Sequence, residues 1–209
     1  MSLNRVIRAT VAGAFVMTMG AGLAFAADPK PKAAEAPKMD AQTQAMMAEM
    51  MKYATPGPEH KVFEPSIGKW KTVVKSWGGP GDPVVSEGTA ESEWILGGRF
   101  IMSRYHGTMM GQPFEGFEVI GYDRKAGTYE GYWLDTMSTA FYPMTKGTWD
   151  EASKTLTFNV EWPNPMGQGN APYKLATKFN GADSKTFMMS MLQAGKEMPM
   201  TEVAYTRMK

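Results

Sequence analysis

Apolar and polar residues alternate along the chain from residue 67 to the C-terminus. Between Ile67 and Trp77, the residues Trp70, Thr72 and Val74 share one side of an extended chain, whereas lysines occupy the other side. A period of two residues is typical of half-buried strands. Segments of the same kind follow one another, separated by Gly, Pro, Asn and Asp. The sequence therefore predicts ten strands, at about 68–77, 84–96, 99–107, 113–122, 128–135, 138–149, 154–162, 172–180, 185–193 and 199–208.

The connections between these segments predict the order of the strands. An aromatic residue, an Asp or Asn, a polar turn and a Thr recur at residues 122–129, 149–156 and 179–187. Because this motif returns after about two strands, it is typical of a meander of hairpins rather than of a Greek key. We therefore expect an all-β fold, in which residues 67–209 form a single antiparallel up-and-down β-barrel of about ten strands, with the last strand beside the first.

One hairpin can be aligned residue by residue, because a Gly97-Gly98 turn sets its register. Placing Leu96 opposite Arg99 puts three pairs on one face: Trp94 with Ile101, Ser92 with Ser103, and Ala90 with Tyr105. The other face then pairs Glu93 with Met102, Glu91 with Arg104, and Thr89 with His106. Because opposite charges meet on this second face, we expect it to contact water and the first face to point inward. In the hairpin 113–135 both faces carry aromatic residues and a carboxylate, so no inward face is assigned.

The first 38 residues lack the alternating pattern. Arg5 and Arg8 precede an apolar run from residue 11 to 25, which ends in Ala24-Phe25-Ala26. This run is shorter than the roughly 20 residues that cross a bilayer, so we interpret residues 1–26 as a cleaved signal peptide rather than an uncleaved anchor. The mature protein is then expected in the periplasm or outside the cell, without stable insertion into a membrane. Residues 27–38, rich in Pro, Ala and Lys, are expected to form a disordered linker.

Residues 39–66 are expected to form an N-terminal helical segment. Pro58 suits the first turn of a short helix at 59–64, whose apolar face consists of Val62 and Phe63. The preceding part lacks Gly and Pro, and it places four methionines at helical spacing: Met46, Met47, Met50 and Met51. Such a stripe is typical of a packing face, which would contact the barrel, a protein partner or a second copy of the chain.

Charge and cysteine content narrow the classes of function. The formal net charge is +1 at pH 7, which gives no electrostatic footprint for nucleic acid. The chain contains no cysteine, so it folds without disulfides in an oxidising compartment. The sequence also contains no Gly-x-Ser-x-Gly or His-Glu-x-x-His motif and no phosphate-binding glycine loop. No catalytic residue is therefore assigned, and a non-catalytic protein is favoured without excluding an enzyme.

Carboxylates, histidines and methionines are the remaining candidates for chemistry. Glu115, Glu118 and Asp135 are interpreted as surface charges, because carboxylates are rarely buried unless they are paired. A haem in the barrel is disfavoured, because His106 falls on the predicted outer face and His60 precedes the barrel. Thioethers suit Cu(I), so copper handling is kept as an alternative to packing, and no metal or other cofactor is assigned. The methionines concerned are Met46, Met47, Met50, Met51, Met109 and Met110.

Several short segments resemble a bacterial family catalogued as domain of unknown function 1579. They are residues 56–60 (PGPEH), 68–70 (GKW), 87–90 (EGTA), 94–100 (WILGGRF), 113–116 (PFEG) and 121–123 (GYD). The resemblance covers about residues 56–209, and WILGGRF is its most specific part. It implies a calycin-like barrel, and it brings no activity, cofactor or catalytic residues with it. More distantly, Gly68-Lys69-Trp70 is similar to the Gly-x-Trp of lipocalins, which implies that Trp70 closes one end of the barrel above the 59–64 helix.

Two classes of function remain. A barrel of about eight to ten strands can hold one ligand, so our first interpretation is an exported carrier or sensor for a small apolar molecule. Small inward residues beside large aromatic ones leave room, and the predicted ligand-binding residues are Trp70, Thr72, Ser92, Trp94, Ile101, Ser103 and Tyr105. The alternative is a structural or interaction module, whose barrel is filled with side chains and whose methionine-rich helix docks on a protein partner or a second copy.

Overall fold

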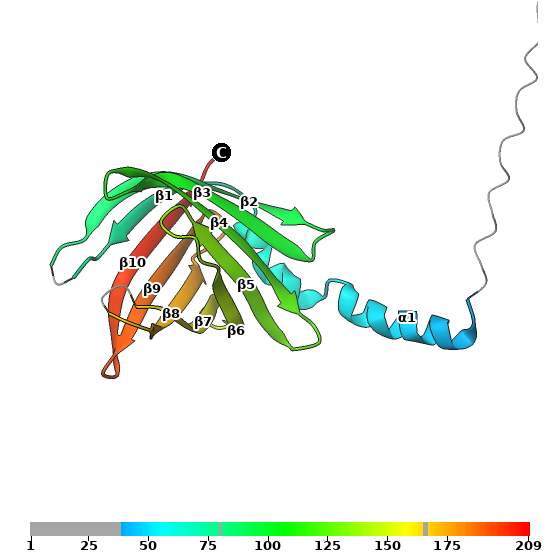
Figure 1. Ribbon diagram of the computed structural model, residues 1–209. Helices are drawn as coiled ribbons and strands as arrows, with labels where there is room; N and C mark the ends of the chain where they lie inside the picture. The colour runs from blue at the N-terminus through cyan, green and yellow to red at the C-terminus, as the bar shows by residue number, and fades with distance from the viewer. Residues whose placement is uncertain (1–38, 80, 165–166) are drawn as a thin grey trace, which may run out of the picture. The chain divides into compact units, whose positions relative to one another are not determined.

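The computed structural model describes residues 39–209 except residues 80 and 165–166. These residues form the helix α1 (Ala41–Ala54), the 3₁₀ helix η1 (Pro58–Ser66) and ten strands (Figure 1). The strands are β1 (Gly68–Ser76), β2 (Val84–Ile95), β3 (Phe100–Met109), β4 (Gln112–Asp123), β5 (Thr128–Asp135), β6 (Tyr142–Asp150), β7 (Thr155–Pro163), β8 (Asn170–Phe179), β9 (Ser184–Gln193) and β10 (Lys196–Arg207). The predicted signal peptide and linker, residues 1–38, lie outside the described residues. Within the described part of the chain, no helix is long and apolar enough to cross a membrane.

The ten strands close into one antiparallel barrel. Each strand pairs with the next strand in the sequence, and β10 pairs with β1. In this closing pair Trp70 is opposite Arg207, and Ser76 is opposite Thr201. Closure gives every strand a hydrogen-bonded neighbour on both sides, which removes exposed sheet edges. The all-β class and the up-and-down order predicted from the sequence are confirmed.

The register predicted for the β2–β3 hairpin is also confirmed. Ser92 is opposite Ser103, Trp94 is opposite Ile101, and Glu91 is opposite Arg104. The connection differs from the predicted two-residue turn, because the strands end at Ile95 and Phe100 and four residues lie between them. Three of these four residues have left-handed backbones, namely Leu96 (φ 48°), Gly97 (φ 67°) and Gly98 (φ 80°). The ion pair of Arg104 runs diagonally, to Glu93 (3.3 Å) rather than to Glu91. Glu91 instead lies 3.8 Å from Lys69, which is directly opposite it on β1.

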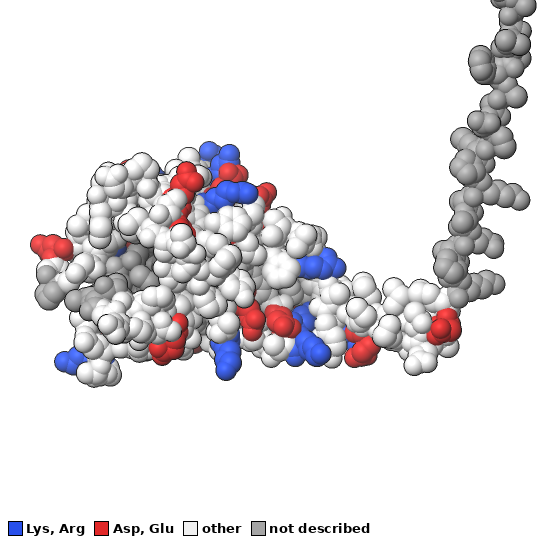
Figure 2. Space-filling view, in the orientation of Figure 1, with Lys and Arg blue, Asp and Glu red and all other residues white. Residues whose placement is uncertain are grey.

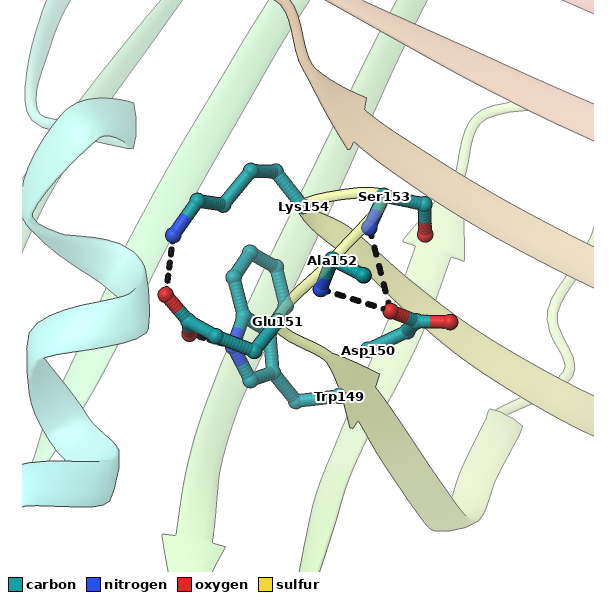
Figure 3. Close-up of polar contacts among 6 residues, drawn as sticks. All are labelled: Trp149, Asp150, Glu151, Ala152, Ser153 and Lys154. Carbon is teal, nitrogen blue, oxygen red and sulfur yellow. Dashed lines mark hydrogen bonds and ion pairs between the residues drawn. The ribbon is translucent and has the colours of Figure 1, made fainter.

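The recurring motif in the sequence forms the turns of the β4–β5 and β6–β7 hairpins. In β6–β7, Oδ1 of Asp150 accepts hydrogen bonds from the backbone N–H groups of Ala152 (2.8 Å) and Ser153 (3.0 Å), as Figure 3 shows. Asp123 accepts from Lys125 and Ala126 in the same way. These bonds satisfy turn backbone groups that no strand can reach. The motif therefore encodes local turn geometry rather than a site.

One end of the barrel is closed by η1 and the buried side chains above it. The indole N–H of Trp70 donates a hydrogen bond to the carbonyl of Ser66 at the end of η1 (2.8 Å). The guanidinium of Arg207 lies over the Trp70 ring, with Cζ 4.2 Å from the ring centroid, and donates to the carbonyls of Pro65 and Ile67. Phe63 of η1 packs edge-on against Trp94 and Tyr129. Trp70 thus closes this end, as the lipocalin resemblance implied, and we call it the closed end.

The methionine stripe of α1 does not pack on the barrel. No residue of α1 is buried, and Met46, Met47, Met50 and Met51 are all exposed. The side chain of Arg124 donates hydrogen bonds to the carbonyls of Lys52 and Thr55, which joins the C-terminal end of the helix to the β4–β5 turn. The six methionines considered for Cu(I) are divided between two places, because Met109 and Met110 lie at the β3–β4 connection, at the end opposite η1.

Candidate functional site

A belt of polar and aromatic residues crosses four strands on the inside of the barrel. Residues directly opposite each other in an antiparallel pair point to the same face of the sheet. Ser92 is opposite Ser103, Ser103 is opposite Glu118, and Glu118 is opposite Trp133. Ser92 and Ser103 are buried, and their hydroxyl oxygens are 2.8 Å apart. The belt therefore faces inward along its whole length.

Glu118 is thus an interior carboxylate, and its interpretation as a surface charge was wrong. It is half-buried and lies directly opposite Ser103 in the β3–β4 pair. Burial raises the pKa of the Glu118 carboxyl, although the charge of Lys185 and the Ser103 hydrogen bond act in the opposite direction. Glu115 is exposed, as predicted, and lies 3.8 Å from His106 on the outer face.

Lys185 places a cation inside the barrel. Its Nζ donates a hydrogen bond to Oγ of Ser66 (3.2 Å) and lies over the rings of Trp70 (5.1 Å) and Tyr205 (4.8 Å). The side chain is 5% exposed. Burial lowers the pKa of the Lys185 ammonium to about 8, opposed by the charge of Glu118 and assisted by that of Arg207. The charges of Lys185 and Glu118 interact through space rather than through a hydrogen bond.

The inward position of Lys185 was not predicted from the sequence, because a lysine at the start of a strand resembles a surface residue. The signal that identifies it is the period of two along β9, which puts Lys185 on the same face as Phe187, Met189 and Met191. Because that face is otherwise apolar, it points into the barrel, and Lys185 points inward as well.

Two tyrosines add hydroxyl groups at the same depth. Tyr205 donates a hydrogen bond to the hydroxyl oxygen of Tyr105 (2.9 Å). Burial raises the pKa of Tyr105 well above its ordinary value and raises that of Tyr205 as well. Both phenols therefore stay protonated at neutral pH and can donate hydrogen bonds. We call the inward groups of this region the interior polar cluster: Ser92, Ser103, Tyr105, Glu118, Lys185 and Tyr205.

Inward-facing side chains beyond this cluster are not completely enclosed. Val74, Tyr105 and Phe187 pack against the core and are still partly exposed, and so are Glu118 and Trp133. Because η1 covers the other end, we interpret this partial exposure as access to the interior from the end opposite η1. Figure 2 shows the surface hollowed between the β1–β2 and β9–β10 hairpins, which Figure 1 places at this end.

Gly116 determines how far Trp133 extends into this space. A Cβ atom at residue 116 would lie 2.2 Å from the Trp133 ring, so the indole lies directly against the backbone of β4. The indole N–H donates to Oδ2 of Asp135 (2.7 Å), which holds the ring in place. The ring of Tyr105 meets it edge-on at 5.2 Å. A glycine here therefore allows a large aromatic side chain to line the wall without filling the barrel.

The seven residues predicted to bind a ligand all lie on the inward face, but at different depths. Five of them are at most 3% exposed and form the closed end and its wall: Trp70, Thr72, Ser92, Ile101 and Ser103. Trp94 is half-buried against Phe63 at the same end, and Tyr105 reaches the accessible interior. The accessible interior also includes Glu118, Trp133 and Phe187, which were not predicted as ligand-binding residues from the sequence.

Two grooves lie outside the barrel wall. One, of about 590 Å³, runs between the end of α1 and the outer face of β3–β5 and is lined by Tyr53, His60, Phe100 and Arg124 among others. The other, of about 410 Å³, lies beside η1. His60 accepts a hydrogen bond from the backbone of Gly57, and burial lowers its pKa. Among the described residues, no three His, Cys, Asp or Glu side chains are grouped closely enough to hold a metal ion.

Comparisons with known proteins place the chain in a family and identify similar barrels. The family described as "Protein of unknown function (DUF1579)" matches residues 55–207. No curated protein matches the chain.

Among solved structures, Rv2717c from M. tuberculosis has a TM-score of 0.56 at 11% identity, covering 74% of this chain and 100% of its own. The S-type phycobiliprotein lyase CPES from Guillardia theta has a TM-score of 0.49 at 13% identity, covering 72% and 93%. A redesigned β-barrel has a TM-score of 0.37 at 11% identity, covering 71% and 96%. At 11% identity, the likeness to Rv2717c shows the fold alone.

Proposed function

The chain belongs to the DUF1579 family, and from the geometry of its barrel we propose that it binds a small, largely apolar molecule inside the barrel. The observation that carries the proposal is the partial exposure of inward-facing side chains, among them Tyr105, Trp133 and Phe187. Ligand pockets typically combine apolar and aromatic walls with a few polar groups. The accessible interior has this composition, because apolar side chains lie beside the interior polar cluster.

The walls and the polar cluster have different roles in the proposed complex. Val74, Phe187 and Trp133 would contact the apolar body of the ligand and exclude water from it. The hydroxyl of Tyr105 and the carboxyl of Glu118 would orient a single polar atom of the ligand, because both residues belong to the interior polar cluster and are only half-buried. Trp70 and the two buried serines support this arrangement from below without contacting the ligand directly.

The proposal also includes the localisation of the protein. Residues 1–26 have the charge pattern and the apolar length of a signal peptide. We therefore expect a mature protein that begins at Ala27 and acts as a carrier or sensor in the periplasm or outside the cell. Intact mass of the protein purified from its source measures the N-terminus, and retention of residues 1–26 would contradict export by cleavage.

A ligand screen tests binding directly. Fatty acids, isoprenoids and aromatic compounds are added to the mature chain, and the melting temperature and tryptophan fluorescence are measured. A ligand present at a hundredfold excess over its Kd stabilises the folded state by about 2.7 kcal/mol. Trp133→Ala is expected to weaken binding about tenfold or more, because it removes one wall. The matched control is Tyr132→Ala, since Tyr132 is the outward neighbour on the same strand. No shift with any compound would contradict the proposal.

A second candidate function rests on α1. Its methionines are exposed and are not buried against the barrel, which supports a role as a docking face for a protein partner or a second copy. Sedimentation velocity of the mature chain and of Met47→Ser/Met50→Ser distinguishes these cases. Loss of a dimer in the variant supports self-association. Competition of the intact helix with a strong Cu(I) chelator would support the copper alternative instead.

A further inference from the structure

Exposed apolar side chains surround the end of the barrel opposite η1. They lie at or beside four of the five hairpin connections of that end, and they are 39–83% exposed. We call this set the apolar rim: Val84, Val85, Met110, Met137, Phe141 and Met198. Soluble proteins expose single apolar residues routinely, but a group of them around one opening marks an interaction surface.

The two ends of the barrel differ sharply in charge. The described residues of the connections at the rim end are 77–79, 81–83, 110–111, 136–141, 164, 167–169 and 194–195. Among these described residues, Asp82 alone is charged. Four connections at the closed end contain Arg99, Arg124, Lys125, Glu151, Lys154 and Asp183. Near the rim, Glu197 forms an ion pair with Lys174, and Asp135 accepts hydrogen bonds from Trp133 and Met137. The rim end is therefore nearly neutral as well as apolar.

We propose that the apolar rim docks on the surface of a lipid bilayer, with the opening of the barrel facing the acyl chains. The proposal rests on the proposed function, because a largely apolar ligand dissolves in a bilayer and would enter the barrel from there. Methionine, phenylalanine and valine side chains at the tips of hairpins can enter the boundary between head groups and acyl chains. Asp82 is the sole charge in these described connections, so charge does not oppose their entry.

The near-neutral charge of the rim also predicts which lipid composition is sufficient for docking. Attraction to anionic lipids requires clustered Lys or Arg and weakens with salt. The described lysines near these connections are dispersed, and two of them form ion pairs: Lys75 with Glu202 and Lys174 with Glu197. Lys196 is the third. Docking is therefore expected on bilayers of phosphatidylcholine, without anionic lipid, and it is expected to persist at high salt.

Flotation of the mature chain with phosphatidylcholine vesicles tests the rim. The unaltered chain is expected to float with the vesicles at about 0.1 M and at about 1 M NaCl alike. Met110→Ser/Phe141→Ser is expected to reduce the bound fraction at least about tenfold, because it removes two apolar tips. The matched control, Leu96→Ser/Met208→Ser, removes two exposed apolar side chains elsewhere and is expected to float normally. Binding that requires anionic lipid and disappears at high salt would overturn the proposal.

Ligand binding without vesicles separates this inference from the proposed function. Met110→Ser/Phe141→Ser is expected to keep the ligand-induced rise in melting temperature, because neither residue contacts the interior polar cluster. Ligand binding by an unaltered chain that never floats would overturn the rim proposal and leave the proposed function intact. If the unaltered chain neither bound a ligand nor floated with vesicles, the proposed function and the rim proposal would both be overturned. Sedimentation velocity tests the alternative that a second copy of the chain binds the rim. A dimer that is lost in Met110→Ser/Phe141→Ser, with no flotation of either chain, would assign the rim to self-association and overturn the bilayer proposal.

Discussion

At the scale of single residues, Lys185 couples the stability of the barrel to pH. Its pKa is about 8 in the folded protein against 10.5 for an exposed lysine. Between these values the unfolded chain binds more protons than the folded protein, so stability rises with pH. We expect the free energy of unfolding to increase by about 2 kcal/mol from pH 8 to 10. Urea unfolding at each pH measures it, and the rise is expected to be absent in Lys185→Met.

Other titrating groups limit the pH range, from 8 to 10, over which Lys185 dominates the change in stability. Lys178→Met is the control, because Lys178 is an exposed lysine on the neighbouring strand β8, and it should retain the rise. The raised pKa of Glu118 acts at lower pH with the opposite sign, since the folded protein there binds more protons than the unfolded chain. Above pH 10 the tyrosines of the unfolded chain ionise before Tyr105 and Tyr205, so stability falls again. A flat profile between pH 8 and 10 would contradict the buried position of Lys185.

Ser92 tests whether the ligand site extends to the closed end. Ser92 is buried and lies 2.8 Å from the Ser103 hydroxyl, so extra atoms meet packed neighbours. Ser92→Leu is expected to cost about 1–3 kcal/mol through overpacking, whereas Ser92→Ala should cost about 1 kcal/mol through loss of one hydrogen bond. Chemical denaturation measures both. If Ser92→Leu left stability unchanged and abolished ligand binding, the site would reach the seven residues that the sequence indicated.

At the scale of elements, the contact between β4 and β5 keeps the interior accessible. Gly116→Val is expected to displace the Trp133 indole into the barrel, because a Cβ atom would lie 2.2 Å from the ring. The expected results are ligand binding at least about tenfold weaker and a stability loss of about 1–3 kcal/mol. Gly107→Val is the control, since its Cβ would have ordinary contacts at 3.4 Å. Equal effects of the two substitutions would contradict the role given to Gly116.

The turns show why local sequence was informative about elements. Asp123 and Asp150 occupy equivalent turn positions, and the residues four places later, Gly127 (φ 73°) and Lys154 (φ 54°), share a left-handed backbone. The same short motif thus produced the same turn twice, because its hydrogen bonds lie within five residues. Strand ends were less well determined. The strand predicted from 138 begins at Tyr142, because residues 136–141 form a longer connection.

At the scale of the whole molecule, the barrel is expected to be independent of α1. No residue of α1 is buried, and the family match begins at residue 55. A chain that starts at Thr55 should therefore form the same barrel, with a melting temperature within about 2 °C of the mature protein, since the loss is below about 1 kcal/mol. Differential scanning calorimetry measures it. A decrease beyond about 5 °C would show that Arg124 and the helix end stabilise the barrel more than their exposed hydrogen bonds suggest.

The molecule as a whole has two unlike ends. The closed end carries η1, the buried Trp70 and most of the charged connections, whereas the other end carries the apolar rim and gives access to the interior. This polarity follows from the up-and-down order, which sends alternate connections to opposite ends. It orients the proposed ligand entry and the proposed membrane contact in the same direction.

The sequence by itself determined the strands, their order and one register. Period-two alternation and Gly or Asp turns act over a few residues, so they were enough to place Ser92 opposite Ser103. Only the tertiary structure decided which charges lie inside. Alternation divides a strand into two faces, but it does not select the inner one when both carry mixed residues, as around Glu118. Closure of β1 on β10 made that choice, and it brought Lys185, Glu118 and the two tyrosines together from strands far apart in the chain.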